Sequence, residues 1–193
     1  MPLVIPEWYE RFKMVAIDPG VNTTGVSVFD IETRTGKILN IEAQTLTNSK
    51  LANMTGLDPD IVPERTIKLF KLRDAIVYIL NFVRPTVVAC EAPFYNSLMP
   101  MAYGSLMEVT GMVHQSVLAY NSNTPFHLLA PQLVKKSLGV AGKKGKEVVM
   151  EAVKNRPDLI QVLSTPLETL DEHSIDSIGV GDALLRYRLY PKE

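Results

Sequence analysis

The chain has 193 residues, of which 46% are hydrophobic and 21% are charged, and its formal net charge is −1. These values are typical of one compact soluble domain over residues 1–193, with residues 1–13 as an N-terminal extension. The single cysteine, Cys90, excludes an internal disulfide framework. No apolar run approaches the ~20 residues that span a bilayer, and residues 1–13 lack the continuous apolar core of a secretory signal, so we expect a cytoplasmic protein without membrane contact.

The first half of the sequence predicts three antiparallel strands and a long loop. Residues 14–18 are apolar, a turn rich in proline, glycine and asparagine follows, and residues 26–31 return to a strand pattern, which together indicate a hairpin. Mainly polar and mainly apolar positions alternate over residues 38–46, which suits a third antiparallel strand. Residues 47–63 lose this periodicity and collect Asn, Gly, Asp and Pro, which predicts a loop.

The second half of the sequence alternates helices and strands. Apolar residues at helical spacing predict a helix over residues 64–83, which Pro85 stops, and the apolar residues 86–90 predict a buried strand. Further patterns indicate a helix over 101–120, a strand over 126–129, a basic helical region over 132–156 and a last helix over 172–190. This order predicts an α/β fold: a mixed central sheet, three antiparallel strands then parallel strands, with helices on both faces.

Two acids end predicted strands in this sheet. Asp18 follows the first strand and Glu91 follows the strand at 86–90, so both would lie at one edge of the sheet, where sites in such folds form. Asp18 alone is also compatible with a turn cap. Glu91 alone is compatible with a salt bridge to a lysine, because an unpaired carboxylate near a core is costly.

The last predicted helix carries a histidine and an acid on one face. His173 and Asp176 are three residues apart, about one helical turn, so they could bind one ion. Gly179 and Gly181 indicate close approach of this helix to the sheet, which would bring Asp176 toward Asp18. Asp182 falls on the opposite side of the helix from His173 and is left out of the site. Asp171 and Glu172 suit helix capping better than metal binding.

Converging carboxylates predict a metal-dependent site, because they repel one another unless a cation lies between them. Mg²⁺ is a hard ion that prefers carboxylate oxygen, and the histidine makes Mn²⁺ an acceptable substitute. We expect Asp18, Glu91 and Asp176 to be ligands of such an ion, with His173 as a ligand or a proton carrier.

A basic segment lies in the sequence between Glu91 and His173. Residues 131–156 hold seven bases and two acids, an excess that the net charge of the whole chain conceals. Such a segment can bind nucleic acid with an affinity that falls steeply with salt, although it is also compatible with an ordinary solvated face.

With these elements in order, the sequence resembles the RuvC-like Holliday junction resolvases over most of its length. Four pieces carry the resemblance: Ile17-Asp18-Pro19-Gly20 with Gly25, then Glu91 followed by Pro93-Phe94, the basic run from Ala130-Pro131-Gln132 through Gly142 to Lys146-Glu147, and His173-Ser174-Ile175-Asp176. Three departures are Val140, where members often have glycine, the additional N-terminal extension over residues 1–13, and the loop at 47–63, which has no assigned counterpart.

The resemblance implies an RNase H-like fold, a homodimer, and two divalent ions per active site that cleave opposing strands of a four-way DNA junction and leave 5′ phosphates. It implies a catalytic role for Lys146 beside the three acids and His173. With two ions bound, Asp18 would be the bridging ligand, and Glu91 and Asp176 would flank it. Lys135 and Lys146 would contact the scissile phosphate region and Phe94 would stack on bases. The residues expected to bind DNA are Phe94, Lys135, Lys136, Lys143, Lys144 and Lys146.

Other functions remain open from the sequence. A nuclease of the same fold could act on flaps, forks or RNA. The turn Asp18-Pro19-Gly20 also fits the phosphate loop of sugar-kinase or actin-type ATPases, although those proteins need two lobes and a second glycine-rich loop. A non-catalytic junction-binding module is disfavoured, because all four metal-ligand positions keep residues that can bind metal.

Overall fold

A computed structural model describes residues 9–53, 55–95, 100–143 and 147–191. The three predicted antiparallel strands are present as β1 (Arg11–Asp18), β2 (Thr23–Glu32) and β3 (Ile38–Thr47). A short 3₁₀ turn, Asn48–Lys50, follows β3, and the rest of the expected loop has no helix or strand among its described residues.

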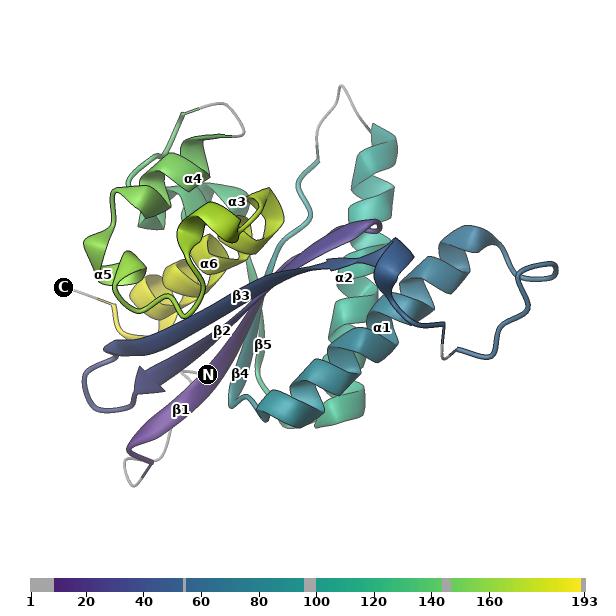
Figure 1. Cartoon of the computed structure of the whole chain (residues 1–193), viewed down its shortest axis with the longest axis horizontal. Helices are drawn as coiled ribbons and strands as arrows, with labels where there is room; N and C mark the ends of the chain where they lie inside the picture. Colours follow the sequence, from purple (N-terminus) through teal and green to yellow (C-terminus); the bar gives the residue numbers. More distant parts are fainter. Residues whose placement is uncertain (1–8, 54, 96–99, 144–146, 192–193) are drawn as a thin grey trace.

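The remaining elements complete a five-stranded mixed sheet in the order β3-β2-β1-β4-β5 (Figure 1). Strand β4 pairs in parallel with both β1 and β5, as expected for the second half of the fold. The longer elements of this half are α1 (Glu64–Val83), β4 (Val87–Glu91), α2 (Pro100–Tyr120) and β5 (Phe126–Leu129). In the part of the chain that the structure describes, no helix is long and apolar enough to cross a membrane.

The basic region is not one helix, which corrects the sequence prediction for residues 132–156. It forms α3 (Pro131–Ser137) and α4 (Glu147–Lys154), followed by the short α5 (Pro157–Ile160). Gly139 and Gly142 have φ of 74° and 78°, in the left-handed region that favours glycine and interrupts a helix. The last helix is α6 (Glu172–Leu184), which continues as a π-helical turn over Leu185–Leu189.

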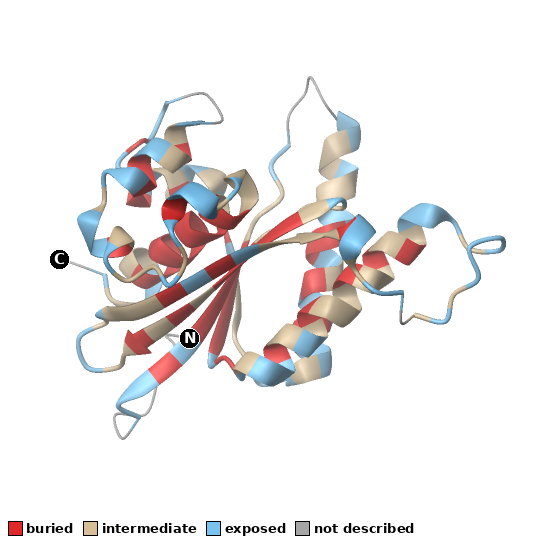
Figure 2. Ribbon diagram, in the orientation of Figure 1, coloured by how far each residue is buried: buried red, intermediate tan, exposed pale blue. Residues whose placement is uncertain are grey.

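Helices cover both faces of the sheet, and the buried residues form one core on each face (Figure 2). Helices α1 and α2 pack on one face, and α3, α4 and α6 pack on the other (Figure 1). Successive residues of β1 alternate between the cores: Met14 and Ala16 face the α6 side, whereas Val15 and Ile17 face α1 and α2. Because side chains alternate along a strand, Asp18 continues the series of Met14 and Ala16 and lies on the α6 side of the sheet.

The same alternation applies to β4 and gives Glu91 the same direction. Val87 and Ala89 belong to the core under α6, whereas Val88 and Cys90 belong to the core under α1 and α2. Glu91 therefore continues the series that faces α6. Cys90 is completely buried, which agrees with its interpretation as a small core residue.

Two glycines allow α6 to lie close to the sheet. A Cβ at Gly181 would lie 2.2 Å from the ring of Phe29 in β2, and a Cβ at Gly25 in β2 would lie 1.8 Å from the carbonyl oxygen of His173. Gly179 differs from expectation, because its nearest neighbours are the side chains of Leu138 and Val134, at 3.1 Å, and not the sheet. Close approach to the sheet is thus confirmed for Gly181 and wrong for Gly179.

Candidate metal-dependent active site

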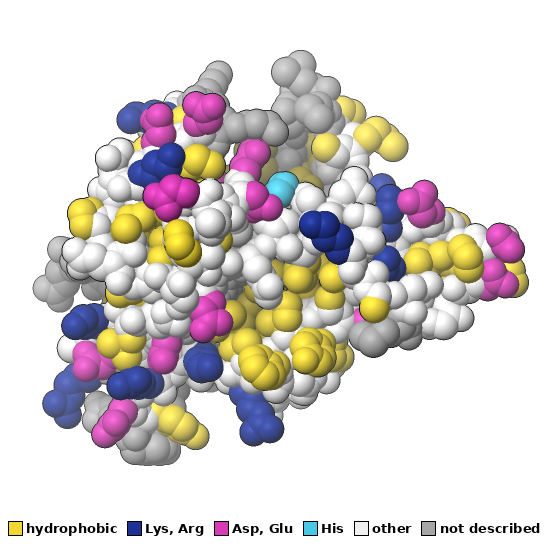
Figure 3. Space-filling view, in the orientation of Figure 1, with side chains coloured by type: hydrophobic (Ala, Val, Ile, Leu, Met, Phe, Trp, Pro, Cys, Tyr) yellow, Lys and Arg dark blue, Asp and Glu magenta, His cyan; other side chains and the backbone are white. Residues whose placement is uncertain are grey.

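The carboxyl ends of the two central strands bring Asp18 and Glu91 to one edge of the sheet. Strands β1 and β4 are paired in parallel up to Ile17 and Cys90, and the two acids are the next residues along each strand. Both acids continue the alternating series of residues that faces α6, so the helix and the acids lie on the same side of the sheet. Figure 3 shows acidic side chains and a histidine together on the surface between the two groups of helices.

His173 at the start of α6 contacts both the end of β1 and the start of β2. Its Nδ1 donates to Oδ2 of Asp18 at 2.9 Å, and its Nε2 lies 2.7 Å from Oγ1 of Thr23. The turn after β1 is held instead by Thr24, whose hydroxyl donates to the carbonyl of Gly20 and accepts from its N–H. Asp18 therefore contacts the histidine, and within the described chain the turn is capped by Thr24.

The N-terminus of α6 is fixed by its own cap and by β2. Asp171 is the N-cap residue and accepts a hydrogen bond from the backbone N–H of Ser174 at 3.0 Å, as expected from its position. Asp171 also accepts a hydrogen bond from the hydroxyl of Thr45 in β3. Gly25, which pairs with Asp18 across the β1–β2 ladder, lets the backbone of His173 approach. The cap and the glycine together place His173 beside Asp18.

The charge of Asp18 perturbs the titration of Glu91 and Asp176. Burial, then the charges of Asp18 and Asp176, raise the pKa of Glu91 to about 8. Burial, then the charge of Asp18, raises the pKa of Asp176 to about 7. The hydrogen bond to Asp18 raises the pKa of His173 above its ordinary value. The site therefore holds more acidic groups than its own surroundings stabilise as anions, a pattern that is common at functional sites.

The donor set suits a divalent cation. In the residues that the structure describes, no three or more His, Cys, Asp or Glu side chains are already close enough together to hold a metal ion. The carboxylates are nevertheless close enough for their charges to raise the pKa values of Glu91 and Asp176. A cation among them would remove this repulsion, and carboxylate oxygens are the ligands that Mg²⁺ and Mn²⁺ favour. Asp18, Glu91 and Asp176 are the residues that would hold it, beside His173.

The predicted DNA-binding residues have different surroundings. The charge of Lys135, in α3, lowers the pKa values of both Glu91 and Asp176, so this lysine lies beside the acids. Lys136 lies elsewhere, with its Nζ 5.7 Å from the ring centroid of Tyr187. Lys143 and Phe94 are exposed to solvent. Lys144 and Lys146 lie outside the described residues.

Sequence reasoning missed Thr23 and the clefts beside it. Thr23 lines two neighbouring clefts, of about 550 and 440 Å³, at the start of α1. Lys68 lines both clefts, Arg65 lines the first and Lys71 the second. No spacing rule identifies these residues, because α1 packs on the face of the sheet opposite to α3 and α4 and lies far from Thr23 in the sequence.

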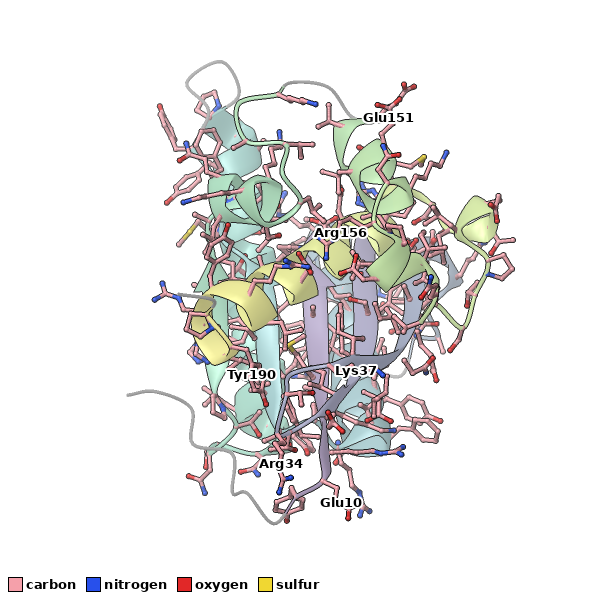
Figure 4. All side chains as sticks on the ribbon, turned by 90° about the vertical axis from the view of Figure 1, so that its left-hand side faces the viewer. Glu10, Arg34, Lys37, Glu151, Arg156 and Tyr190 are labelled. Carbon is pink, nitrogen blue, oxygen red and sulfur yellow. The ribbon has the colours of Figure 1, made fainter. Side chains whose placement is uncertain are left out.

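Asp182 lies outside the site, as predicted. Its side chain is 1% exposed, and Oδ1 accepts hydrogen bonds from Arg156 at 3.2 Å and Arg186 at 2.8 Å. Arg156 also pairs with Asp158 at 2.6 Å, and it lies beside α6 in the view of Figure 4. This cluster joins the end of α4 and α5 to α6 and leaves its acids paired.

Comparisons with known proteins give structural matches without sequence matches. No protein-family model matches the chain, and no curated protein matches it significantly. Thermus thermophilus RuvC superposes with a TM-score of 0.62 at 21% identity, over 89% of this chain and 92% of that one. The same protein in complex with a Holliday junction substrate gives a TM-score of 0.61 at 19% identity, over 92% and 95%.

The yeast mitochondrial Holliday junction resolvase is a further match, with a TM-score of 0.60 at 16% identity, covering 91% of this chain and 78% of that one. Identities this low establish the fold and do not establish the activity. The sheet order, the direction of each strand and the helices on both faces agree with the prediction. The chain has the RNase H-like fold of RuvC and other Holliday junction resolvases.

Proposed function

We propose that the chain is a divalent-metal-dependent endonuclease that cuts branched DNA, and that residues 1–193 act as one nuclease domain. The observation that carries this proposal is the convergence of Asp18, Glu91 and Asp176 beside His173 at the carboxyl ends of the central strands. The fold shared with resolvases supports a nuclease over the alternatives. The described residues form one sheet, whereas an actin-type ATPase needs two lobes.

Each residue has a role that follows from its surroundings. Asp18 and Glu91 end neighbouring strands and would hold the cation from the sheet, while Asp176 would hold it from α6. Two divalent ions bound here would supply an activated water and stabilise the leaving 3′ oxygen, giving 5′ phosphate ends. In the metal-free protein, His173 contacts the Asp18 carboxylate through its Nδ1. Lys135 offers a positive charge beside the acids for a backbone phosphate.

The preferred substrate in this proposal is a four-way DNA junction. A solved structure of RuvC, which has the same fold, is a complex with a Holliday junction substrate, and this supports the choice for the present chain. Cutting opposing strands needs two active sites, so we propose a homodimer related by a two-fold axis. Phe94, exposed three residues beyond Glu91, is available to stack on a base at the junction.

A cleavage assay tests the proposal directly. Matched four-way, Y-shaped, flap and linear DNAs are incubated with the protein in Mg²⁺, in Mn²⁺ and in EDTA. Paired symmetric nicks with 5′ phosphates, confined to the four-way DNA and absent in EDTA, are expected. Equal cleavage of flaps or forks would make the protein a broader branched-DNA nuclease, and cleavage of none of the branched DNAs would contradict a nuclease.

The Asp18→Asn variant tests the site itself. We expect cleavage to fall more than about 100-fold, because the loss of even an outer partner of a metal ligand costs 10–100-fold. Junction binding in EDTA should be kept or tightened, since one negative charge is removed from the surface that meets DNA. Asp60→Asn, an exposed acid in the loop after β3, is the matched control and should cut at the wild-type rate. Wild-type cleavage by Asp18→Asn would contradict the assignment.

A further inference from the structure

Both ring nitrogens of His173 have a partner in the structure. Nδ1 donates to Asp18 at 2.9 Å, and Nε2 lies 2.7 Å from the hydroxyl oxygen of Thr23. The two partners come from adjacent strands, since Asp18 ends β1 and Thr23 begins β2. The imidazole is therefore held at both ends, with Nδ1 beside Asp18 and Nε2 beside Thr23.

Thr23 is rigidly placed by the backbone around it. It is the first residue of β2 and pairs with Thr47 of β3. The turn before it is tight, because a Cβ at Gly20 would lie 2.2 Å from the carbonyl oxygen of Thr23. The backbone of His173 is equally fixed, since it packs on Gly25, two residues further along β2. The distance from Thr23 to the ring is thus set by the sheet and by the packing of α6.

A neutral imidazole carries its proton on one nitrogen and offers a lone pair on the other. If a cation bound beside Asp18 takes the lone pair of Nδ1, the proton must be on Nε2 and needs an acceptor. The hydroxyl oxygen of Thr23 is that acceptor, because a hydroxyl can accept as well as donate. In this change of tautomer Nδ1 gives one proton to water and Nε2 takes one proton from water, so the charge and the number of protons of the ring are unchanged.

We propose that Thr23 is a positioning residue that holds the Nε2–H tautomer of His173 and so presents the Nδ1 lone pair to a metal ion beside Asp18. The inference rests on the metal site of the proposed function. Ligating histidines commonly donate their second N–H to such a partner, and removal of that partner typically weakens metal binding 10–100-fold.

The test compares Thr23→Val with Thr23→Ser in the full chain, and measures Mn²⁺ binding by calorimetry without DNA. Valine keeps the shape and the strand preference but has no hydroxyl, whereas serine keeps the hydroxyl. We expect Thr23→Val to weaken Mn²⁺ binding 10–100-fold and Thr23→Ser to stay within about threefold of wild type. Thr47→Val, across the β2–β3 ladder, is the matched control and should bind as wild type, because its side chain caps no helix.

Two measurements separate this role from a merely structural one. In the Mg²⁺-loaded protein, two-bond ¹⁵N–¹H spectra of the His173 ring should report the Nε2–H tautomer for wild type and serine and a mixture for valine. In a His173→Ala background, Thr23→Val should cause no further loss of Mn²⁺ affinity. An equal loss in that background, or wild-type affinity of the single valine variant, would overturn the inference.

The outcome is distinguishable from a failure of the proposed function. If wild type binds Mn²⁺ in a manner that needs Asp18 and Thr23 but cuts no branched DNA, the positioning role stands and the nuclease proposal fails. If wild type cuts four-way DNA and Thr23→Val binds Mn²⁺ normally, the positioning role fails and the nuclease proposal stands.

Discussion

The two aspartates of helix α6, Asp176 and Asp182, lie in opposite electrostatic surroundings. Asp182 is almost fully buried, and the guanidinium groups of Arg156 and Arg186 both donate to it. Asp176 lies among Asp18, Glu91 and Glu172, and its pKa is raised to about 7 by burial first and by the charge of Asp18 next. One acid is compensated within the chain, and the other is only partly compensated, by Lys135 and His173.

The difference separates a structural carboxylate from a ligand-binding one. A buried carboxylate that is paired with hydrogen-bonding cations contributes to the fold, and removing it takes a buried partner away from those cations. A carboxylate that is buried among like charges destabilises the metal-free protein, so its placement requires another reason, such as a cation from outside. Substitution of Asp176 and of Asp182 should consequently change the stability of the metal-free protein in opposite directions.

Asp182→Ala should give the largest loss of stability. We expect the free energy of unfolding to fall by about 2–4 kcal/mol, somewhat below the cost of breaking a fully buried pair because both guanidiniums reach water. Denaturant unfolding in EDTA measures the change. Mn²⁺ affinity per folded molecule should be unaltered, and a large loss of that affinity would show that the two clusters are not separate.

Asp176→Asn should change stability in the other direction. In EDTA at pH 8 we expect the variant to be more stable than wild type by roughly 1–3 kcal/mol, because a charge is removed from a buried acidic group that water screens in part. Its Mn²⁺ binding and cleavage should be lost. A destabilised variant under these conditions would mean that Asp176 is paired in solution, as Asp182 is.

The pH dependence of stability gives a third comparison. The pKa values of Glu91 and Asp176 are raised to about 8 and about 7, so the folded metal-free protein keeps protons that the unfolded chain loses. This contribution to stability in EDTA should therefore be fully present below about pH 4, near the pKa values of the unfolded chain, and should be lost as the pH rises through about 7 and about 8. The raised pKa of His173 acts in the same direction.

Saturating Mn²⁺ should remove or reverse this slope, because metal binds the deprotonated ligands. Thermal unfolding at a series of pH values, with and without metal, is the measurement. A flat profile in EDTA would contradict the mutual repulsion of the acids.

Most of the fold could be predicted from the sequence, because the patterns that predict it lie within single strands and helices. Alternation and apolar runs predicted all five strands, and strand ends at Asp18 and Glu91 predicted that the acids share an edge, since parallel central strands align their carboxyl ends. The helical spacing of His173 and Asp176 then gave their common face. These predictions depend on residues within one element or on neighbouring strand ends.

Features that depend on long-range packing were not predictable. Thr23 and His173 are 150 residues apart, and their contact follows from how α6 packs on Gly25, which no periodicity reports. The interruption of the basic segment at Gly139 and Gly142 depends on left-handed backbone conformations that a single sequence does not reveal. Gly179 was assigned to the sheet, although a Cβ at this position would face Val134 of α3 and Leu138 and not a strand.

Lys135 and Lys136 offer the finest comparison, because adjacent residues of α3 point to different partners. Lys135 lowers the pKa values of Glu91 and Asp176, whereas Lys136 lies over Tyr187. Lys135→Ala should lower the stability of the metal-free protein by less than about 1 kcal/mol at pH 8, and make its pH slope steeper. Lys136→Ala should leave that slope unchanged.

Both changes reduce positive charge on the surface proposed to bind DNA, so each should reduce the salt dependence of junction binding by about one ion. Only Lys135→Ala should also slow cleavage at saturating DNA, and equal cleavage by the two variants would remove Lys135 from the site.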